Sequence, residues 1–494
     1  MKKTYNLLLI IALFPIMLHS CFEDRSDDGT DDLLPVLVSG LDNQYEVYSY
    51  RDILRIDPTV QNENRYEFCW LVYSTKYNPN EPALPKADTL SFTKNLDYEV
   101  FLEPGQYILI FNVQDKETKV TTKITSDLFV STLNMKGWYL LTTENNKTDF
   151  DFIYSGGRID KWIKSYNGES LDGNAIKAIF SPQMKPTPTS SNTYNTFFVI
   201  SDKDAGIYRI DNGLKEMGYN DMFFTAPDNK KPETILQPTS TMYSILINDG
   251  KMYILNKGGR FAHPPVSTYK LSPVAAVGAM PLLFDENSKS IVLVDGVNFQ
   301  AMRSLGSDLT NMNADIVWIA SYINVRSQAI ALLLVRKADG SGTVFKFNVL
   351  FQYLYAYGSG TPIIESTKDF SPSHGLMNAD KIAGNCEYDY IYYAKNNNIY
   401  QTDINSAPEK LLFTLPAGET ITCMQHVRFP DSSAASTINY FVIATTANGK
   451  YKVRFYDIST IGELAPSSSM SDIEGNGSVT CVNYLEQGNG SRIY

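Results

Sequence analysis

The sequence predicts an all-β protein with two folded parts, a small β-sandwich followed by a β-propeller. The chain of 494 residues contains 32 Tyr and 25 Phe, together with many Val, Ile and Thr, and such residues favour strands. Short apolar runs alternate with turn residues along most of the chain, and one strand–turn–strand fragment recurs through its larger part. The length is sufficient for two or more domains with cores of their own.

Residues 1–20 have the pattern of a secretory signal peptide, in which two lysines precede the apolar run LLLIIALFPIML (7–18). That run is too short to span a bilayer, which needs roughly 20 residues. The next motif, LHSC (18–21), resembles a bacterial lipobox. The resemblance implies cleavage before Cys21 and attachment of lipid to that cysteine. An ordinary signal peptide with an incidental cysteine is the alternative.

The acidic segment 21–33 predicts a flexible tether, because so polar a stretch cannot bury enough apolar surface to become ordered. It also resembles the export signal that directs lipoproteins of Bacteroidetes-type bacteria to the outer face of the outer membrane. A solvated spacer without that role is the alternative. We therefore expect a lipid-anchored outer-membrane protein that faces the cell exterior.

The net charge and the cysteines narrow the choice of partners and chemistry. A formal charge of −11 disfavours nucleic acid and anionic surfaces, which need clustered lysines and arginines. After Cys21 the chain has four cysteines, each within an apolar, strand-like run, and this predicts buried free thiols. They are Cys69, Cys386, Cys423 and Cys481. A disulfide between Cys423 and Cys481 stays open.

Residues 34–132 predict a small β-sandwich, because strand-like runs follow one another at short spacing with turn residues between them. The runs are YEVYSY (45–50), YEFCWLVYS (66–74), DYEVFLE (97–103), GQYILIFNVQD (105–115) and TKVTTKITSDLFV (118–130). The last two, with the preceding Glu-Pro, resemble the final strands of a PKD-type immunoglobulin-like domain. The resemblance implies that Trp70 is the core tryptophan of such a domain, and that the domain serves as a spacer or binding module, since PKD-type domains rarely catalyse.

Residues 134–494 predict a seven-bladed β-propeller. A turn followed by a short apolar strand recurs seven times, and several copies have another apolar strand just upstream, so each reads as a hairpin. The copies are KTDFDFIY (147–154), DAGIYRID (204–211), DGKMYILN (249–256), SKSIVLVD (288–295), GSGTVFKFN (340–348), NNNIYQTD (396–403) and NGKYKVRFYD (448–457). Hairpins need neighbours for stability, and a ring of blades supplies them. An irregular sandwich, or a pair of sandwiches, is the alternative.

The last apolar run predicts how such a ring closes. GSVTCVNYLEQ (477–487) would pair beside MKGWYLLTT (135–143), which removes an exposed sheet edge. With these features at both ends, the whole chain resembles PKD-like family surface lipoproteins of Bacteroidetes. That resemblance implies an association with Sus-type nutrient importers of the outer membrane and capture of a polysaccharide or peptide.

No motif predicts a cofactor, a metal site or a catalytic centre. The three histidines after the signal, His263, His374 and His426, lack metal-ligand spacing. SDKDAG (201–206) has part of a calcium-loop pattern, but it falls where a hairpin turn is expected. Asp88-Thr89-Leu90 fits a short O-glycosylation motif of Bacteroidetes.

Two groups of aromatic residues are candidates for stacking on a ligand. Trp162 and Tyr166 lie in KWIKSYNG, and Tyr353, Tyr355 and Tyr357 lie in FQYLYAYGSG. Rings in a β-protein also fill cores, and this alternative stays open for both groups. Because side chains alternate between the two faces of a strand, Tyr353, Tyr355 and Tyr357 would lie on the same face.

The leading hypothesis is a non-catalytic surface protein that binds a glycan or peptide at the propeller channel. One alternative is a propeller glycoside hydrolase or lyase, which needs acids with perturbed pKa values converging at the channel mouth. Another is a structural accessory subunit of an outer-membrane importer, which needs a large exposed apolar patch.

Overall fold

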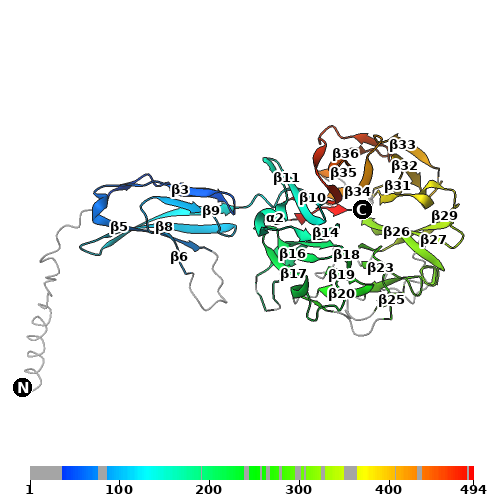
Figure 1. The fold of residues 1–494 in the computed structure, drawn as a ribbon, viewed down its shortest axis with the longest axis horizontal. Coiled ribbons are helices and arrows are strands. Elements are labelled where there is room, and N and C mark those ends of the chain that lie inside the picture. Colours follow the sequence, from blue (N-terminus) through cyan, green and yellow to red (C-terminus); the bar gives the residue numbers. More distant parts are fainter. Residues whose placement is uncertain are drawn as a thin grey trace, which may run out of the picture. The chain divides into compact units, whose positions relative to one another are not determined.

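The computed structural model describes most of the chain, and the chain divides into two compact units (Figure 1). The larger unit is Ser131–Tyr494 with the short pieces Tyr48–Tyr50 and Phe101–Pro104, and the smaller unit holds the rest of the preceding chain. The described residues are 36–75, 86–187, 189–190, 192–237, 244–255, 259–262, 268–277, 281–294, 302–304, 307–323, 329–349, 364–385, 387–406, 408–430, 437–486 and 489–493.

The smaller unit is a β-sandwich built on one five-stranded antiparallel sheet. Its order is β2 (Gln44–Tyr48), β9 (Thr121–Ser131), β8 (Gly105–Asp115), β5 (Tyr66–Ser74) and β6 (Asp88–Ser91). Two further pairs complete it, β3 (Ile53–Ile56) with β7 (Leu96–Glu99) and β1 (Val38–Ser39) with β4 (Thr59–Val60).

Trp70 lies at the centre of the core of the sandwich. Its side chain is 1% exposed, and its ring stacks on Phe111 with a centroid distance of 4.4 Å. The indole N–H donates to the carbonyl of Lys94 at 3.0 Å, so the one polar group of the ring is satisfied. The expected core role of Trp70 is confirmed.

The larger unit contains seven antiparallel sheets arranged in a ring, which confirms the predicted propeller and its seven blades (Figure 1). From the inner to the outer strand, blades 1 to 4 are β39 (Ser478–Glu486), β10 (Gly137–Glu144), β11 (Lys147–Tyr154), β12 (Gly157–Ile159); β14 (Ala175–Met184), β15 (Tyr194–Ser201), β16 (Ala205–Arg209), β17 (Lys215–Gly218); β18 (Pro232–Leu236), β19 (Ser244–Asn248), β20 (Lys251–Leu255), β21 (Phe261–Ala262); and β22 (Ala276–Val277), β23 (Pro281–Asp285), β24 (Ser290–Val294), β25 (Met302–Ser304).

Blades 5 to 7 continue the ring in the same order. They are β26 (Ala314–Ile323), β27 (Ala329–Lys337), β28 (Gly342–Asn348), β29 (Ile364–Phe370); β30 (Lys381–Gly384), β31 (Tyr390–Lys395), β32 (Asn398–Asp403), β33 (Lys410–Thr414); and β34 (Thr420–Phe429), β35 (Ile438–Ala447), β36 (Lys450–Ile458), β37 (Leu464–Pro466). Four short strands extend blades 1 and 7: β13 (Leu171–Asp172), β38 (Ile473–Asn476), β40 (Asn489–Gly490) and β41 (Arg492–Ile493).

The seven predicted hairpin fragments correspond to the third strands of the blades, from β11 to β36. The apolar strands just upstream are the second strands. Both faces of these strands are buried, as in β27, where Ala329–Val335 is buried without interruption. Continuous apolar runs between Asn, Asp or Gly turns are therefore visible in the sequence.

A separate hydrophobic cluster fills each junction between neighbouring blades. Alternate residues of one strand serve different clusters: Phe197 packs with blade 1, whereas the adjacent Phe198 packs with blade 3. The same holds at the other junctions around the ring. Every blade is thus stabilised by both of its neighbours, because no single sheet could bury two apolar faces alone.

The ring is closed by the late strand β39, which pairs antiparallel with β10 as the sequence predicts. Trp138 lies opposite Tyr484 and Leu140 opposite Val482. Blade 1 is therefore made from residues more than 300 positions apart along the chain. Within the described residues, no helix is both long and apolar enough to cross a membrane.

Gly477, at the entry to β39, offers a test of the closure. Its φ is +88°, and an added Cβ would lie 2.2 Å from the carbonyl oxygen of Thr143 on β10. Gly418 has a nearly equal φ of +84° with nothing within 4 Å of that position. We expect Gly418→Ala to lower the free energy of unfolding by about 1 kcal/mol, from backbone strain alone.

We expect Gly477→Ala to cost about 3 kcal/mol or more, because the new methyl group also pushes the closing strand off β10. Urea unfolding of both variants measures the difference. Equal costs would show that β39 can move without loss, contrary to its role in closure.

Candidate functional site

The inner strands of all seven blades surround a central cavity of about 840 Å³, referred to below as the channel. Pockets of ~300–1,000 Å³ are typical of small-ligand sites. Each blade repeats the same up-and-down strand order, so the inner strands run in one direction around the axis. The first residues of the inner strands therefore gather at one end of the channel, called here the strand-start end. Their last residues gather at the other end, called the strand-finish end.

The last residues of the chain line the strand-finish end of the channel. β40 pairs with β39, and β41 pairs with β34 through Arg492 and Arg428. Gly490 lies so close to Phe180 that an added Cβ would approach its Cβ to 2.7 Å. The same end is lined by Phe429. The C-terminal segment thus gives the two ends of the channel different walls.

Trp318, on β26, lines the channel together with Phe180 and Phe429, and the sequence did not single out any of the three. The side chain of Trp318 is only partly buried. The ring packs beside Gly384 of the next inner strand, where an added Cβ would lie 3.2 Å from Cζ2. The absence of a side chain at Gly384 leaves room for the ring, which therefore forms part of a largely apolar wall.

Two free thiols lie on adjacent inner strands of the channel. Cys423 on β34 and Cys481 on β39 are buried, and no disulfide joins them. Burial raises the pKa of both thiols, so they stay protonated and unreactive. The side chain of Gln425 accepts from the Cys423 thiol at 3.2 Å and donates to the Val482 carbonyl at 2.5 Å, which ties β34 to β39.

The charges of the channel are few and of one sign. Among the described residues that line it, the charged side chains are Lys177 on β14 and Lys381 on β30, and there is no Asp or Glu. Burial lowers the pKa of Lys177. Other polar groups come from Thr, Ser, Asn and Gln side chains, so the channel offers cations and neutral hydrogen-bonding groups on an apolar wall.

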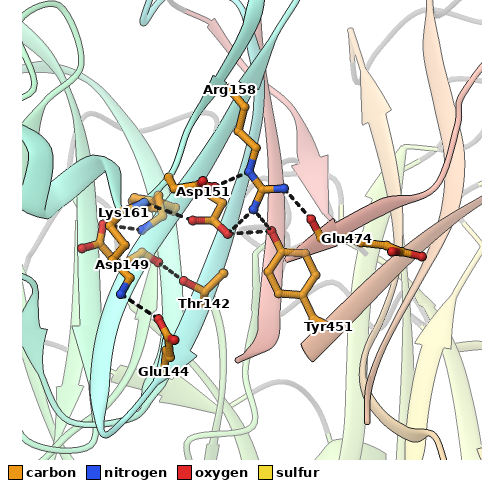
Figure 2. A network of polar contacts seen from close by, with 10 residues as sticks. Thr142, Glu144, Asp149, Asp151, Arg158, Lys161, Tyr451 and Glu474 are labelled. Atoms are coloured by element: carbon orange, nitrogen blue, oxygen red, sulfur yellow. Dashed lines mark hydrogen bonds and ion pairs between the residues drawn. The ribbon is translucent and has the colours of Figure 1, made fainter. Parts of the chain in front are cut away.

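A second pocket, of about 490 Å³, lies at the seam where blade 7 meets blade 1, and it is densely charged (Figure 2). Asp151 accepts from the Arg158 guanidinium at 2.7 Å and from the Tyr451 hydroxyl at 2.6 Å. Arg158 also donates to the carbonyl of Glu474 on β38. The network joins β11 and β12 of blade 1 to β36 and β38 of blade 7.

Asp149, two residues before Asp151 on β11, caps the short helix α2 (Trp162–Asn167). Its carboxylate accepts the backbone N–H groups of Ile163 at 2.6 Å and Lys164 at 3.1 Å, and the hydroxyl of Ser170 at 2.5 Å. Burial raises the pKa of Asp149 to about 6, so the group is ionised at neutral pH. With its oxygens occupied by these donors and by its neighbour's N–H, Asp149 is structural.

The cations of the seam pocket are largely matched by anions. Lys161 pairs with Glu144 at 2.8 Å, and Lys147 pairs with Asp172. This arrangement stabilises the closure of the ring and leaves little charge for a ligand. The channel differs, because its two lysines have no such partners among the described residues.

The structure places Trp162 in the hydrophobic core and thereby corrects its assignment as a ligand-stacking residue. The side chain is 0% exposed, packs at the junction of blades 1 and 2, and donates its N–H to Asn134 at 3.2 Å. Tyr166 is half-buried, its hydroxyl bonds the same Asn134 oxygen, and its ring covers Gly213. Tyr353, Tyr355 and Tyr357 lie outside the described residues.

The remaining candidate residues have local structural roles. The segment 201–206 forms the turn between β15 and β16, as expected. His374 accepts the Leu376 N–H and caps a 3-10 turn, and burial lowers the pKa of His426 to about 4, which leaves it neutral. The described residues contain no group of three or more His, Cys, Asp or Glu side chains that could hold a metal. Cys21, His263 and Cys386 lie outside them.

The sandwich, with its stacked Trp70, lies within a part of the chain that matches a known family. Residues 21–175 match the model of the PKD-like family. The match covers the sandwich and runs into blade 1. No curated protein matches the chain in sequence.

Several solved structures resemble the chain distantly. A quinonprotein alcohol dehydrogenase-like protein from Bacteroides thetaiotaomicron is 14% identical, with 92% of this chain and 99% of that chain covered and a TM-score of 0.42. The WD40 domain of SCAP from fission yeast is 13% identical over 61% and 74%, with a TM-score of 0.34.

A third resemblance is to SGBP-B of a mixed-linkage glucan utilization locus of Bacteroides ovatus, solved with a mixed-linkage heptasaccharide. It is 12% identical over 92% and 91%, with a TM-score of 0.15. Scores this low support no argument about function, and the propeller is established by its strand pairing.

The structural role of Asp149 can be tested by Asp149→Asn, which would turn an amide N–H₂ toward the Lys164 N–H or the Ser170 hydroxyl. We expect the free energy of unfolding to fall by about 1–3 kcal/mol, because a buried donor loses its acceptor. Urea unfolding measures the change. The matched control is Glu169→Gln, which removes an exposed carboxylate of the same pocket and should change stability by less than ~0.5 kcal/mol. Equal stability of the two variants would contradict the capping role.

Proposed function

We propose that this chain is a non-catalytic binding protein and that its propeller takes a glycan or peptide in the channel. The single observation that carries the proposal is the central cavity of about 840 Å³ with the partly buried Trp318 in its wall. A preformed, mostly apolar cavity with a few polar groups is the usual form of a small-ligand site.

A glycan fits the channel better than a peptide. Sugar rings carry apolar faces that stack on aromatic side chains, and Trp318 provides such a face on β26. The surrounding Gln, Asn, Thr and Ser side chains supply both donors and acceptors for hydroxyl groups. The size of the cavity suits a short oligosaccharide, or the end of a longer one.

The placement of carboxylates favours binding over glycoside hydrolysis. Hydrolysis commonly uses two carboxyl groups ~5–10 Å apart across the reacting bond. The channel lining described above contains none, and the buried pair Asp149 and Asp151 is occupied in holding α2 and Arg158. These acids serve the fold of blade 1.

The proposed location is the exterior face of the outer membrane, and it rests on the sequence. Lipid on Cys21 would anchor the chain, the acidic segment 21–33 would be the tether, and the sandwich would be a spacer. Several acyl chains bind a membrane stably, whereas one binds only marginally. In this setting the protein would serve as an accessory to a Sus-type nutrient importer.

The binding proposal predicts retention of ligand without turnover. The full-length chain in detergent is applied to an array of polysaccharides and peptides, and reducing ends, unsaturated products and released peptides are measured in parallel. We expect retention on a glycan and no product. Product release would overturn the non-catalytic role, and retention only on peptides would overturn the preference for a glycan.

On the retained glycan, Trp318→Ala should weaken binding by about tenfold, since an aromatic contact contributes roughly 1–1.5 kcal/mol, and Trp318→Phe should lose less. The control is Phe224→Ala, which removes a ring that is 59% exposed and does not line the channel. Equal effects of Trp318→Ala and Phe224→Ala would contradict a channel site.

The anchor predicts that Cys21→Ala releases the protein from membranes. In cells fed a radiolabelled fatty acid, we expect label on the wild-type chain and none on the variant, with the variant in the soluble fraction. Protease added to intact cells should digest the wild-type chain. An unlabelled wild-type chain, or one protected from protease, would contradict lipidation or exterior exposure respectively.

A further inference from the structure

The channel concentrates positive charge in a protein that is acidic overall. The chain has 54 Asp and Glu against 43 Lys and Arg, yet the described lining of the channel has Lys177 and Lys381 and no acid. A neutral ligand would require no such selection. The lining of the channel is therefore positively charged as well as largely apolar.

The two lysines lie toward the same end of the channel. Lys177 is the third residue of β14 and Lys381 the first of β30, so both are near the strand-start end. β30, β34, β39 and β14 follow one another around the ring, so the two cations stand at the ends of an arc of four consecutive inner strands. Lys177 is half-buried and Lys381 is exposed.

Neither ammonium group is neutralised by the described part of the protein. In the seam pocket Lys147, Arg158 and Lys161 each have a carboxylate within 4 Å, whereas Lys177 and Lys381 have none among the residues that the structure describes. Burial lowers the pKa of Lys177, because the charged form loses part of its hydration there. An anion bound beside it would remove that cost.

We infer that the channel selects acidic oligosaccharides, with the carboxylate of a uronic-acid unit held between Lys177 and Lys381 while a neighbouring ring stacks on Trp318. This inference rests on the proposed function and names its substrate class. A sulfate group offers the same charge, but a planar carboxylate is the smaller group and suits a site with only two cations.

The test uses the full-length chain and oligogalacturonate, with the carboxyl-reduced form of the same oligosaccharide and a sulfated neutral oligosaccharide as comparisons. We expect tight binding to oligogalacturonate and at least about tenfold weaker binding to the reduced form. A hydrogen bond to a charged group contributes enough binding free energy to account for a factor of about ten. Binding to the acidic form should weaken as salt rises, because the contact is ionic.

Lys177→Gln and Lys381→Gln should each lower affinity for oligogalacturonate roughly ten- to hundredfold. The matched control is Lys164→Gln, which removes an exposed lysine of the seam pocket and should leave affinity unchanged. Because the pKa of Lys177 in the free protein is lowered, Lys177 should lose its charge as the pH rises, before exposed lysines do. Affinity for oligogalacturonate should therefore begin to fall at a pH below the range in which exposed lysines titrate. Lys177→Arg, whose guanidinium stays charged, should remove this part of the pH dependence.

A second measurement needs no ligand. Lys177 is half-buried and has no carboxylate partner among the described residues, so its removal should not destabilise the fold, and Lys177→Met should raise or preserve the melting temperature. A lower melting temperature would show that Lys177 has a structural partner and would overturn the inference.

The outcomes separate this inference from the proposed function. Binding of neutral glycans that Trp318→Ala abolishes and the lysine variants leave intact would sustain the proposed function and refute the acidic ligand. Preference for the sulfated probe would refute the uronic acid. Retention of neither a glycan nor a peptide would refute both.

Discussion

The pairing of β39 with β10 is the interaction on which the rest of the propeller depends. Each junction between blades holds a hydrophobic cluster that is complete only when both neighbours are in place. Without β39, blade 1 would lack its inner strand, and the clusters on either side of it would be open to water. The seam network strengthens this point, because Arg158 reaches from blade 1 to Tyr451 and the Glu474 carbonyl of blade 7.

The sequence predicted the middle of every blade and missed its borders. Second and third strands are buried on both faces, so they read as apolar runs joined by Asn, Asp or Gly turns. Inner strands are harder to recognise because one edge lines the channel and some are very short: β22 has two residues, and β30 is KIAG. Closure by β39 was predictable because a propeller without it would leave an unpaired edge, a constraint that acts on the whole ring.

The site was less predictable than the fold, for a reason that Trp162 and Trp318 illustrate. Trp162 lies among polar residues in KWIKSYNG, yet α2 folds back so that its ring meets Tyr139 and Phe197 of two different strands. Trp318 lies in the apolar run IVWIAS, which is typical of core; it does pack against the cluster between blades 5 and 6, but it also lines the channel. In both cases burial is decided by contacts far away in the sequence. The position of Trp318 in the chain could still have identified it. It precedes the β27–β28 hairpin, and an inner strand that borders the channel must lie there.

Stability and ligand chemistry are carried by different parts of the propeller. Apolar clusters between blades and paired charges at the seam hold the ring, whereas the polar groups of the channel stand on the inner strands, whose apolar residues also belong to those clusters. A costly group such as Lys177 can therefore be kept in the channel, because the energy lost there is small beside the apolar area buried at seven junctions. The ligand specificity of this protein should therefore be encoded in its inner strands, which are the part of each blade with the weakest sequence signal.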